Sequence, residues 1–442
     1  MKIGLIAMSG VRVKNQRMIE LGVTLPQFVS RGKVIAQLPS LALLIIASLT
    51  PDDIDVEYVE IGDIKDVKDL NRDYDLVAIS SYTAQAYELY ELADRYRKEK
   101  IPVVLGGLHV TVMPEEAKEH ADAIVIGEAE PVWKVLIDDF KKGELKPVYR
   151  QAQPGSFDLT QSPVPRYDLL KNQQYNRITV QTVRGCPHLC EFCASSPLWG
   201  GTFRQKSVAQ VLHEIETICQ YWKNPFIEFA DDNSFVNKKW AKDFLKKLAR
   251  YNIRWFTESD ISIAADSEMI DLMYQSGCYQ LLIGLESISD RSLNKIDRDN
   301  WKLKQRDKYL KSIHILQSHG ISVNGCFIAG LDGDTPDTFE SIYQFIQESN
   351  LLEVQITVLT PFPGTPLYYR LKKEGRLLQE KFWDRCTLFD VNYHPKQMTV
   401  QELEDGVLGL FNRVYNEKEF TRRKRLYMEI SKQLQGRVYA NT

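Results

Sequence analysis

The chain has little of three features that would each have fixed its class at once. It carries only seven cysteines in 442 residues, too few for a disulfide-bonded secreted scaffold, which indicates a reducing compartment. Its longest fully apolar run, residues 41–47, is too short to cross a bilayer, so no transmembrane segment is expected. Its formal net charge of −3 argues against a nucleic-acid-binding face. With no secretory signal at the amino terminus, these absences predict a cytoplasmic protein of two or three domains.

Three of the cysteines stand together in the segment VRGCPHLCEFCASS, as Cys186, Cys190 and Cys193. A [4Fe–4S] cluster bound by four cysteines is saturated, whereas one bound by three leaves an iron open to a small molecule, as chemistry at a metal requires. Zinc would need a fourth ligand, and His188 lies between two of the cysteines, where it could serve only with distortion. The spacing therefore favours a cluster over a zinc knuckle or buried apolar cysteines. The remaining cysteines are interpreted as packing residues: Cys219, Cys278, Cys326 and Cys386.

The first 150 residues alternate apolar runs with amphipathic stretches. KIGLIAM, DVEYVEI, DLVAISS, PVVLGG and AIVIG are typical of parallel strands buried on both faces, and helical patterns lie between them. This order predicts a doubly wound, Rossmann-like α/β domain over 1–150, whose ligands bind beyond the carboxyl ends of the strands. Each of those ends taken alone is an ordinary strand-to-helix turn, but together they supply the candidate residues Ser80, Ser81, Thr83, Gly106, Gly107, His109, Thr111, Gly127, Glu128 and Glu130.

A second αβ region follows a mostly polar, Pro-containing linker at 151–176. From residue 177 six strand-like runs recur, each followed by an amphipathic helical pattern. They predict a partial (β/α)6 barrel over 177–375, with its active site at the carboxyl-terminal mouth of the strands. The cysteine motif follows the first strand, so we expect it at that mouth. A helical carboxy-terminal extension is predicted over 376–442.

The cysteine motif resembles that of the radical S-adenosylmethionine (radical SAM) enzymes. Residues 106–133 ahead of it are similar to the cobalamin-binding domain of the class B members, and the resemblance covers about 1–400. It implies a [4Fe–4S] cluster on the three cysteines, SAM on the open iron and Phe192 near the adenine. The DxHxxG signature of a cobalt-ligating histidine is absent, so the resemblance implies base-off cobalamin, with His109 left as a cobalt ligand, a wall residue or a helix-start residue.

Further strand ends match positions at which the family holds SAM. ADDNSF at 230–235 matches its amino-group motif in a variant form, although a loop rich in Asp and Asn is also an ordinary turn or helix cap. GLES at 284–287 matches the ribose position, and a carboxylate there requires a partner. The resemblance thus makes candidates of Asp231, Asp232, Asn233, Glu258, Ser259, Glu286, Ser287 and Ile328.

The resemblance implies a cobalamin-dependent radical SAM enzyme that methylates an unactivated carbon through a 5′-deoxyadenosyl radical and methylcobalamin. It also implies a small-molecule or lipid substrate and a flavodoxin or ferredoxin as electron donor. Two alternatives stay open. One is a non-methylating class B enzyme, either an oxidative cyclase of the magnesium-protoporphyrin monomethyl ester type or a ring-rearranging enzyme. The other is a non-enzymatic cobalamin or redox sensor, which would need no open iron. A methylthiotransferase is disfavoured, because that family carries further cysteines in its amino-terminal domain and none here precedes Cys186.

Overall fold

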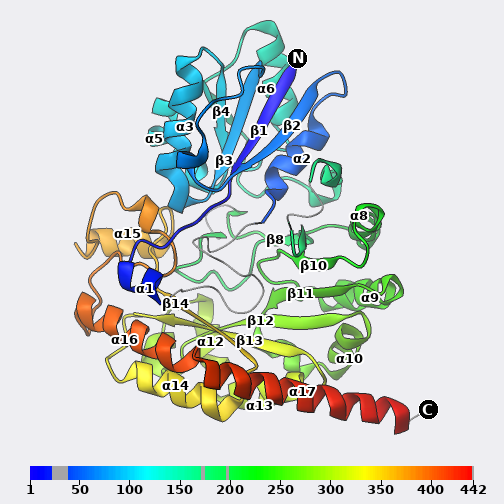
Figure 1. Ribbon diagram of the computed structural model, residues 1–442, viewed down its shortest axis with the longest axis vertical. Helices are drawn as coiled ribbons and strands as arrows, with labels where there is room; N and C mark the ends of the chain where they lie inside the picture. The colour runs from blue at the N-terminus through cyan, green and yellow to red at the C-terminus, as the bar shows by residue number, and fades with distance from the viewer. Residues whose placement is uncertain (22–37, 171–174, 196–198, 441–442) are drawn as a thin grey trace.

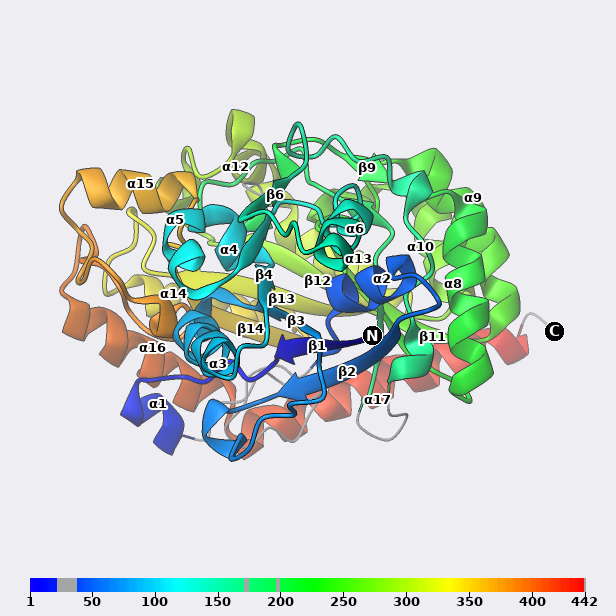
Figure 2. The same ribbon diagram turned by 90° about the horizontal axis from the view of Figure 1, so that it is seen from above.

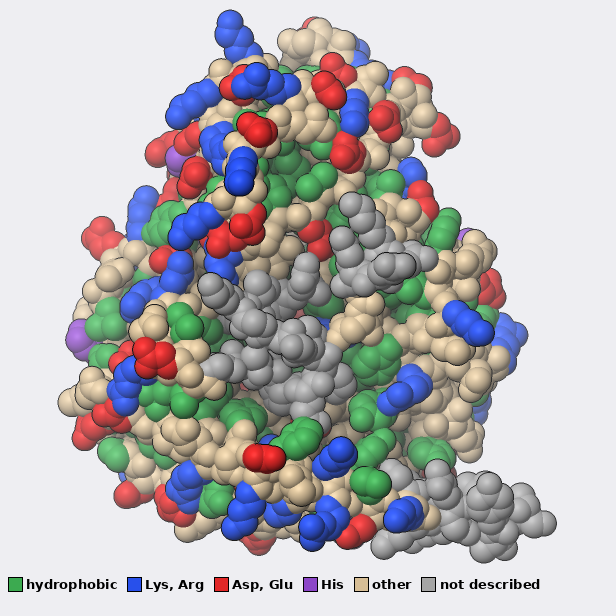
Figure 3. Space-filling model, in the orientation of Figure 1, with side chains coloured by type: hydrophobic (Ala, Val, Ile, Leu, Met, Phe, Trp, Pro, Cys, Tyr) green, Lys and Arg blue, Asp and Glu red, His purple; other side chains and the backbone are tan. Residues whose placement is uncertain are grey.

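The computed structural model describes residues 1–21, 38–170, 175–195 and 199–440. It contains two six-stranded parallel sheets, and the amino-terminal one lies above the other in Figure 1. Seen from above (Figure 2), α8 and α9 lie at one end of the lower sheet and α15 at the other. No helix of the described ranges is long and apolar enough to span a membrane. Acidic and basic side chains are interspersed over the amino-terminal half of the face in Figure 3, in keeping with the small net charge.

The amino-terminal sheet has the strand order β2-β1-β3-β4-β5-β6, with every pair parallel. Such an order is doubly wound, and the winding reverses between β1 and β3. Five strands match the predicted apolar runs. The sixth, β6, is three residues long and carries no periodicity that would predict it. The strands are β1 (Lys2–Met8), β2 (Asp55–Ile61), β3 (Leu76–Ser81), β4 (Val103–Gly106), β5 (Ala123–Ile126) and β6 (Val148–Arg150).

Helices cover both faces of this sheet and divide its hydrophobic core in two. One core lies under α3, with Leu89 and Leu92 fully buried, and the other lies under α2 and α6, with Leu136 and Ile137 fully buried. Ser40 caps the start of α2 by accepting from the Leu43 N–H. The helices are α1 (Gln16–Glu20), α2 (Leu41–Leu49), α3 (Ala86–Lys98), α4 (Leu108–Val112), α5 (Pro114–Ala117) and α6 (Trp133–Lys142).

The second sheet is the predicted partial barrel, with the order β14-β13-β12-β11-β10-β7 and all pairs parallel. Its strands are β7 (Ile178–Val180), β10 (Phe226–Phe229), β11 (Arg254–Ser259), β12 (Cys278–Glu286), β13 (Ser322–Ala329) and β14 (Glu353–Val358). The helices that follow them are α8 (Val208–Tyr221), α9 (Lys238–Leu248), α10 (Ser267–Gln275), α11 (Asp290–Leu293), α12 (Trp301–Gln305), α13 (Tyr309–Ser318), α14 (Thr338–Ser349) and α15 (Pro366–Lys373). The fold class predicted from the sequence is confirmed.

The predicted first barrel strand is broken in two. β7 ends at Val180, and β8 (Val183–Arg184) turns away to pair with β9 (Arg204–Gln205) in an antiparallel hairpin. The break is stabilised by the buried carboxylate of Asp231, which accepts from the Thr182 N–H at 2.6 Å and the Val183 N–H at 3.0 Å. These bonds replace the ladder partners that a continuous strand would have had.

The carboxy-terminal extension is helical only from Val400, in α16 (Val400–Val414) and α17 (Glu417–Ala440). The prediction of a helical segment from residue 376 is wrong for 376–399, which holds one short 3-10 turn, η10 (Trp383–Arg385). Trp383 and Phe382 instead pack into the core beneath α3 of the amino-terminal domain. Burial against a second domain and an isolated antiparallel bridge between Leu377 and Tyr393 hold this segment, so no periodicity reveals it in the sequence.

Candidate cofactor sites

The three clustered cysteines lie on the loop that follows β8, at the carboxyl mouth of the barrel. All three are partly buried, and the Cys193 N–H donates to the Cys190 carbonyl at 3.1 Å. Phe192 packs against the barrel core. Of the other cysteines, Cys278 and Cys386 are buried as predicted, whereas Cys219 is exposed on α8. Cys219 is therefore no packing residue, because the amphipathic helix that carries it turns it to solvent.

The surroundings of the thiols fit a cationic cluster. Burial raises the pKa of Cys186 to about 11, with Cys193 and Asp232 adding to the effect and Lys302 opposing it. Burial also raises the pKa of Cys190. Thiolates are stable in such a place only beside positive charge, which iron provides. Within the described ranges no three His, Cys, Asp or Glu side chains converge on one ion.

The start of the cluster loop is held by the segment 230–235. Gly185 has φ +91°, and a Cβ there would come within 1.9 Å of the Thr202 carbonyl oxygen, so only glycine fits. Its N–H donates to Asp232 at 2.6 Å. Asp231 accepts from two backbone N–H groups and two hydroxyls. Both side chains thus bind backbone of the loop rather than presenting free acceptors at the mouth. Asp231 has four hydrogen-bond partners within the protein, and a role for it toward SAM stays a prediction.

Asn233 keeps a free acceptor. Its Nδ2 donates to Asp260 at 2.9 Å, while its buried Oδ1 has no partner among the described residues. Burying an unpaired polar atom is costly, which favours a ligand that donates there. Asn233 is therefore the member of the 230–235 segment that best fits the ammonium of SAM.

The cluster loop is anchored on its other side by the segments that follow β11 and β12. His188 Nε2 lies 3.2 Å from Asp260 Oδ2, and its ring lies 4.2 Å from that of Trp301. Burial favours the neutral form of Asp260, but hydrogen bonds from His188, Ser262 and Asn233 outweigh it and lower the pKa to about 2. The Glu191 N–H also donates to the Ile296 carbonyl at 2.8 Å. His188 thus has a structural partner, consistent with its exclusion as a metal ligand.

Glu286 lies at the end of β12 beside a lysine that the sequence analysis missed. Lys302 Nζ lies 2.8 Å from Glu286 Oε1 and 2.7 Å from the Gly284 carbonyl oxygen. Glu286 has φ +61°, a left-handed conformation that is rare outside glycine and that clusters at functional sites. Ser287 is fully buried, and its Oγ accepts from the Ser289 N–H. Lys302 is the partner that the strand-end carboxylate required. It lies on a separate helix, and no motif marks it.

Glu258 and Ser259 end the neighbouring strand β11 and lie on its two faces. Ser259 is 8 % exposed, whereas the Glu258 side chain reaches open space. Desolvation and the nearby carboxylates of Glu228, Asp232, Glu286 and Asp231 raise the pKa of Glu258 to about 8. Ile328, another of the predicted SAM contacts, lies on β13 and is 9 % exposed. Several carboxylates therefore gather around Glu258 at the mouth of the barrel.

A second site lies in the amino-terminal domain, where a cavity of about 190 Å³ opens between α2 and the carboxyl ends of β3, β4 and β5. Its wall is mainly apolar and includes Leu43, Ile46 and Val104. The predicted residues that line it are Ser80, Gly106, Gly107, Thr111, Gly127, Glu128 and Glu130. No His, Cys or Met of the described residues lines this wall.

Three predicted residues lie outside this wall, namely Ser81, Thr83 and His109. His109 is fully buried on α4, with its ring 5.4 Å from that of Trp383 and its Nε2 3.6 Å from Glu116 Oε1. Leu108 and Thr111 line the cavity, so the intervening His109 points to another side of the short helix. The options of a cobalt ligand and a cavity wall residue for His109 are corrected.

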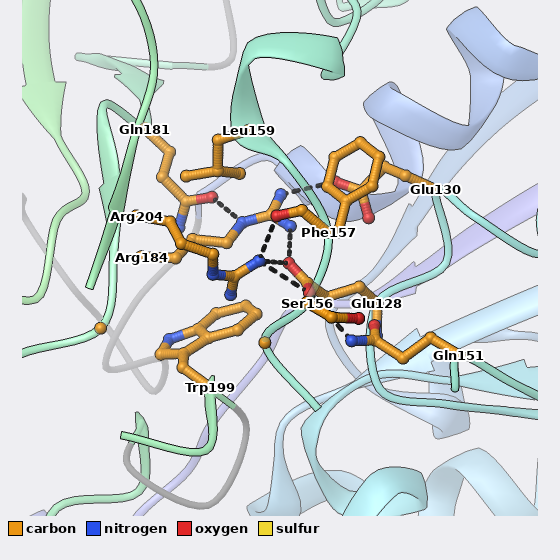
Figure 4. A network of polar contacts seen from close by, with 12 residues as sticks. Glu128, Glu130, Gln151, Ser156, Phe157, Leu159, Gln181, Arg184, Trp199 and Arg204 are labelled. Atoms are coloured by element: carbon orange, nitrogen blue, oxygen red, sulfur yellow. Dashed lines mark hydrogen bonds and ion pairs between the residues drawn. The ribbon is translucent and has the colours of Figure 1, made fainter. Parts of the chain in front are cut away.

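The two sites adjoin at a buried network of charges (Figure 4). Arg184, two residues before Cys186, lines the cavity. Its guanidinium lies 2.5 Å from Glu128 and 2.7 Å from Glu130, and Arg204 lies 2.8 Å from Glu128. The glutamates, predicted as cobalamin contacts, are thus paired with arginines of the barrel domain. Neither arginine is marked by a sequence motif, because no local pattern reveals a pairing between domains.

Three family models match the chain. A B12 binding domain matches residues 30–136, the radical SAM superfamily matches 180–346, and a domain of unknown function (DUF4070) matches 365–440. The chain is 27% identical over 382 residues to bacteriochlorophyllide d C-12(1)-methyltransferase of Chlorobaculum tepidum, covering 85% of this chain and 82% of the relative. It is 29% identical over 393 residues to the C-8(2)-methyltransferase of the same organism, covering 86% of each.

Among solved structures, the fold is similar to that of TsrM, a radical SAM methyltransferase from Kitasatospora setae crystallised with tryptophan and a SAM analogue. The TM-score is 0.67 at 18% identity, over 84% of this chain and 76% of that one. A second structure of TsrM holds cobalamin and a [4Fe–4S] cluster, with a TM-score of 0.64 at 16% identity over 84% and 78% of the two chains. This likeness agrees with the predicted fold class.

Proposed function

The chain belongs to the radical SAM enzymes that carry a B12-binding domain, and on that premise we propose that it is a cobalamin-dependent methyltransferase acting on a carbon atom. The observation that carries the proposal is the position of Arg184. This residue lines the cavity of the B12-binding domain and lies two residues before the first cysteine of the cluster motif. Two cofactor sites that adjoin in this way allow one substrate to meet both.

The residues of the barrel mouth fit the first cofactor pair. Cys186, Cys190 and Cys193 would hold three irons of the cluster and leave the fourth for SAM. Asn233 Oδ1 supplies a buried acceptor without a partner among the described residues, and Glu286 is a carboxylate oriented by Lys302. SAM carries a sulfonium and an ammonium, so the acidic surroundings of Glu258 favour its binding.

The cavity of the amino-terminal domain fits part of a cobalamin. At about 190 Å³ it is too small to enclose the whole molecule, but its apolar wall suits a planar aromatic portion. Gly107 and Gly127 have φ +101° and +84°, conformations that favour glycine. Because glycine has no Cβ atom, this edge stays open at both positions. No histidine of the described wall is available to cobalt, which supports base-off binding.

The hard chemistry belongs to the bound cofactors, which supply a radical and a methyl group when both are present. The protein holds the cluster, orients SAM and keeps the two sites adjacent. We propose a small-molecule or lipid substrate, a reduced flavodoxin or ferredoxin as electron donor, and a cytoplasmic location where such donors occur.

Anaerobic reconstitution with iron, sulfide and hydroxocobalamin tests this function. The expected result is retention of cobalamin through gel filtration. With cell extract and SAM carrying a labelled methyl group, mass analysis should then find a labelled product heavier by one methylene. Failure to retain cobalamin would contradict methyl transfer through cobalt. A product that has lost hydrogens and carries no label would indicate the cyclase alternative instead.

A further inference from the structure

The hairpin that leads into the cluster loop places two like charges side by side. In the antiparallel pair β8–β9, Arg184 lies directly opposite Arg204. Like charges opposite one another destabilise a strand pair, and two strands of two residues each have few hydrogen bonds to compensate. Gly185 and Cys186 follow at once in the chain. The first cysteine of the cluster motif therefore directly follows a hairpin whose two arginines require negative charge to neutralise them.

That charge comes from the other domain, from the loop after β5. Glu128 lies 2.5 Å from Arg184 and 2.8 Å from Arg204, and Glu130 lies 2.7 Å from Arg184. Figure 4 shows the two guanidinium groups side by side with Glu128 against both. The four side chains are between 1 % and 13 % exposed. Two buried positive charges thus face two buried negative charges, and removing one partner would leave a charge uncompensated.

The same loop forms a wall of the cavity in the B12-binding domain. Residues 127–130 all line it, and so do Arg184 and Trp199. The loop is fixed from its own domain, because the Gly127 N–H donates to Thr111 Oγ1 at 3.0 Å and the Glu128 N–H donates to Gln151 Oε1 at 3.0 Å. A ligand that fills the cavity therefore contacts the segment that neutralises the hairpin.

We propose that the loop 127–130 and the Arg184–Arg204 hairpin couple the two cofactor sites, so that cobalamin and the cluster each strengthen the binding of the other. The inference rests on the proposed function and adds regulation to it. Arg184 is a positioning residue: it acts through Gly185 and Cys186. Coupling between two binding sites is reciprocal, so it can be measured from either side.

The test is a titration of the full-length chain with hydroxocobalamin, followed by its visible spectrum. Titrations are run with the reconstituted cluster and after chelation of its iron, so turnover is not needed. In the natural sequence, loss of the cluster should weaken cobalamin binding about fivefold or more. In Glu130→Gln that ratio should fall, because one of the two carboxylates that link loop 127–130 to Arg184 is lost. Glu130 is the site of choice because, among the described residues, its ion pair is with Arg184 alone, while Glu128 remains to neutralise the hairpin.

Glu214→Gln is the matched control. Glu214 pairs with Lys206, which follows β9 directly, and the two side chains are 0 % and 1 % exposed. This variant also removes a buried carboxylate beside the hairpin, but the pair lies wholly within the barrel domain, so the cobalamin ratio should stay at its natural value. Arg184→Lys keeps the charge without the guanidinium fork and should give an intermediate ratio.

Two results would overturn the coupling while leaving the proposed function intact. One is a cobalamin affinity that is equal with and without the cluster in the natural sequence. The other is a ratio that Glu130→Gln leaves unchanged. If Glu130→Gln does not fold, Arg184→Lys carries the same comparison, and an unchanged ratio there is equally contrary. A natural chain that binds no cobalamin in either state would overturn both the coupling and the proposed function.

Discussion

The two parallel sheets of this chain end in contrasting chemistry. At the carboxyl edge of the amino-terminal sheet, the cavity is walled by glycine and by aliphatic residues such as Ala78 and Val125. At the carboxyl edge of the barrel stand three thiols and the carboxylates Glu258 and Glu286. Both edges obey one rule, by which parallel strands present their ligand sites at the same end. The ligand class is therefore set by the residues after each strand rather than by the sheet.

The two edges also differ in backbone strain. Gly107 and Gly127 adopt positive φ in the first sheet, where glycine does so with little strain. In the barrel, Glu286 adopts φ +61° with a side chain and is held by Lys302. A wall free of Cβ atoms suits a bulky ligand with an apolar surface, whereas a strained, charged site suits a small ligand that must be oriented.

The largest effect belongs to the thiols. Replacing Cys186, Cys190 or Cys193 with Ala should abolish production of 5′-deoxyadenosine from SAM, because two thiolates are too few to retain a cluster that binds SAM. Anaerobically reconstituted natural protein should contain about four irons per chain. Cys219→Ala is the control, since that cysteine is exposed on α8, and it should leave iron content and product unchanged. Natural rates of SAM cleavage in any one of the three motif variants would contradict the cluster assignment.

The next effect concerns the apolar edge. Gly106→Leu should weaken cobalamin binding about a hundredfold, because the new side chain would fill part of the cavity. The fold should tolerate it, since a Cβ at Gly106 would meet only Val125 Cβ, at 3.8 Å. Gly62→Leu is the control, because a Cβ there meets no atom within 4 Å and Gly62 does not line the cavity. Equal cobalamin affinity in the two variants would remove the cavity from the binding site.

The contrast also explains what the sequence could and could not predict. Periodicity predicts both sheets, because buried parallel strands are continuous apolar runs. The cysteine spacing predicts the cluster loop, because the three ligands lie close together in the sequence. The missed residues, Arg184, Arg204 and Lys302, each find their partners on another element, and no local pattern carries such pairings. Asp231 and His109 stand at positions that match family motifs, but the direction in which each side chain points depends on the backbone around it. Only the folded chain sets that direction.

A smaller effect is expected at the strained strand end of the barrel. Glu286→Gln should weaken SAM binding on the order of tenfold, the equivalent of one hydrogen bond to a charged group. Iron content should stay unchanged, because Glu286 is assigned to the ligand and not to the cluster. Asp290→Asn, an exposed acid at the start of α11, is the control. An unchanged SAM dissociation constant would assign Glu286 the structural role of holding Lys302 in place.

The smallest effect is a pH dependence at Glu258. Desolvation, together with Glu228, Asp232, Glu286 and Asp231, raises the pKa of Glu258 from 4.5 to about 8. Between these values the folded chain holds a proton that the unfolded chain has released. Stability therefore falls as pH rises through this window.

The glutamine in Glu258→Gln does not titrate, so this variant should not show the loss of stability with rising pH. The natural chain should thus lose about 2 °C of unfolding temperature relative to Glu258→Gln between pH 6 and pH 9, a small shift because the side chain is open to solvent. Calorimetry at the two pH values measures it. Glu348→Gln, which changes an exposed acid on α14, should show no such divergence. A natural chain that gains stability over Glu258→Gln at high pH would mean that Glu258 lies beside a positive group. The barrel mouth would then not be the cation-binding edge that distinguishes it from the cavity above.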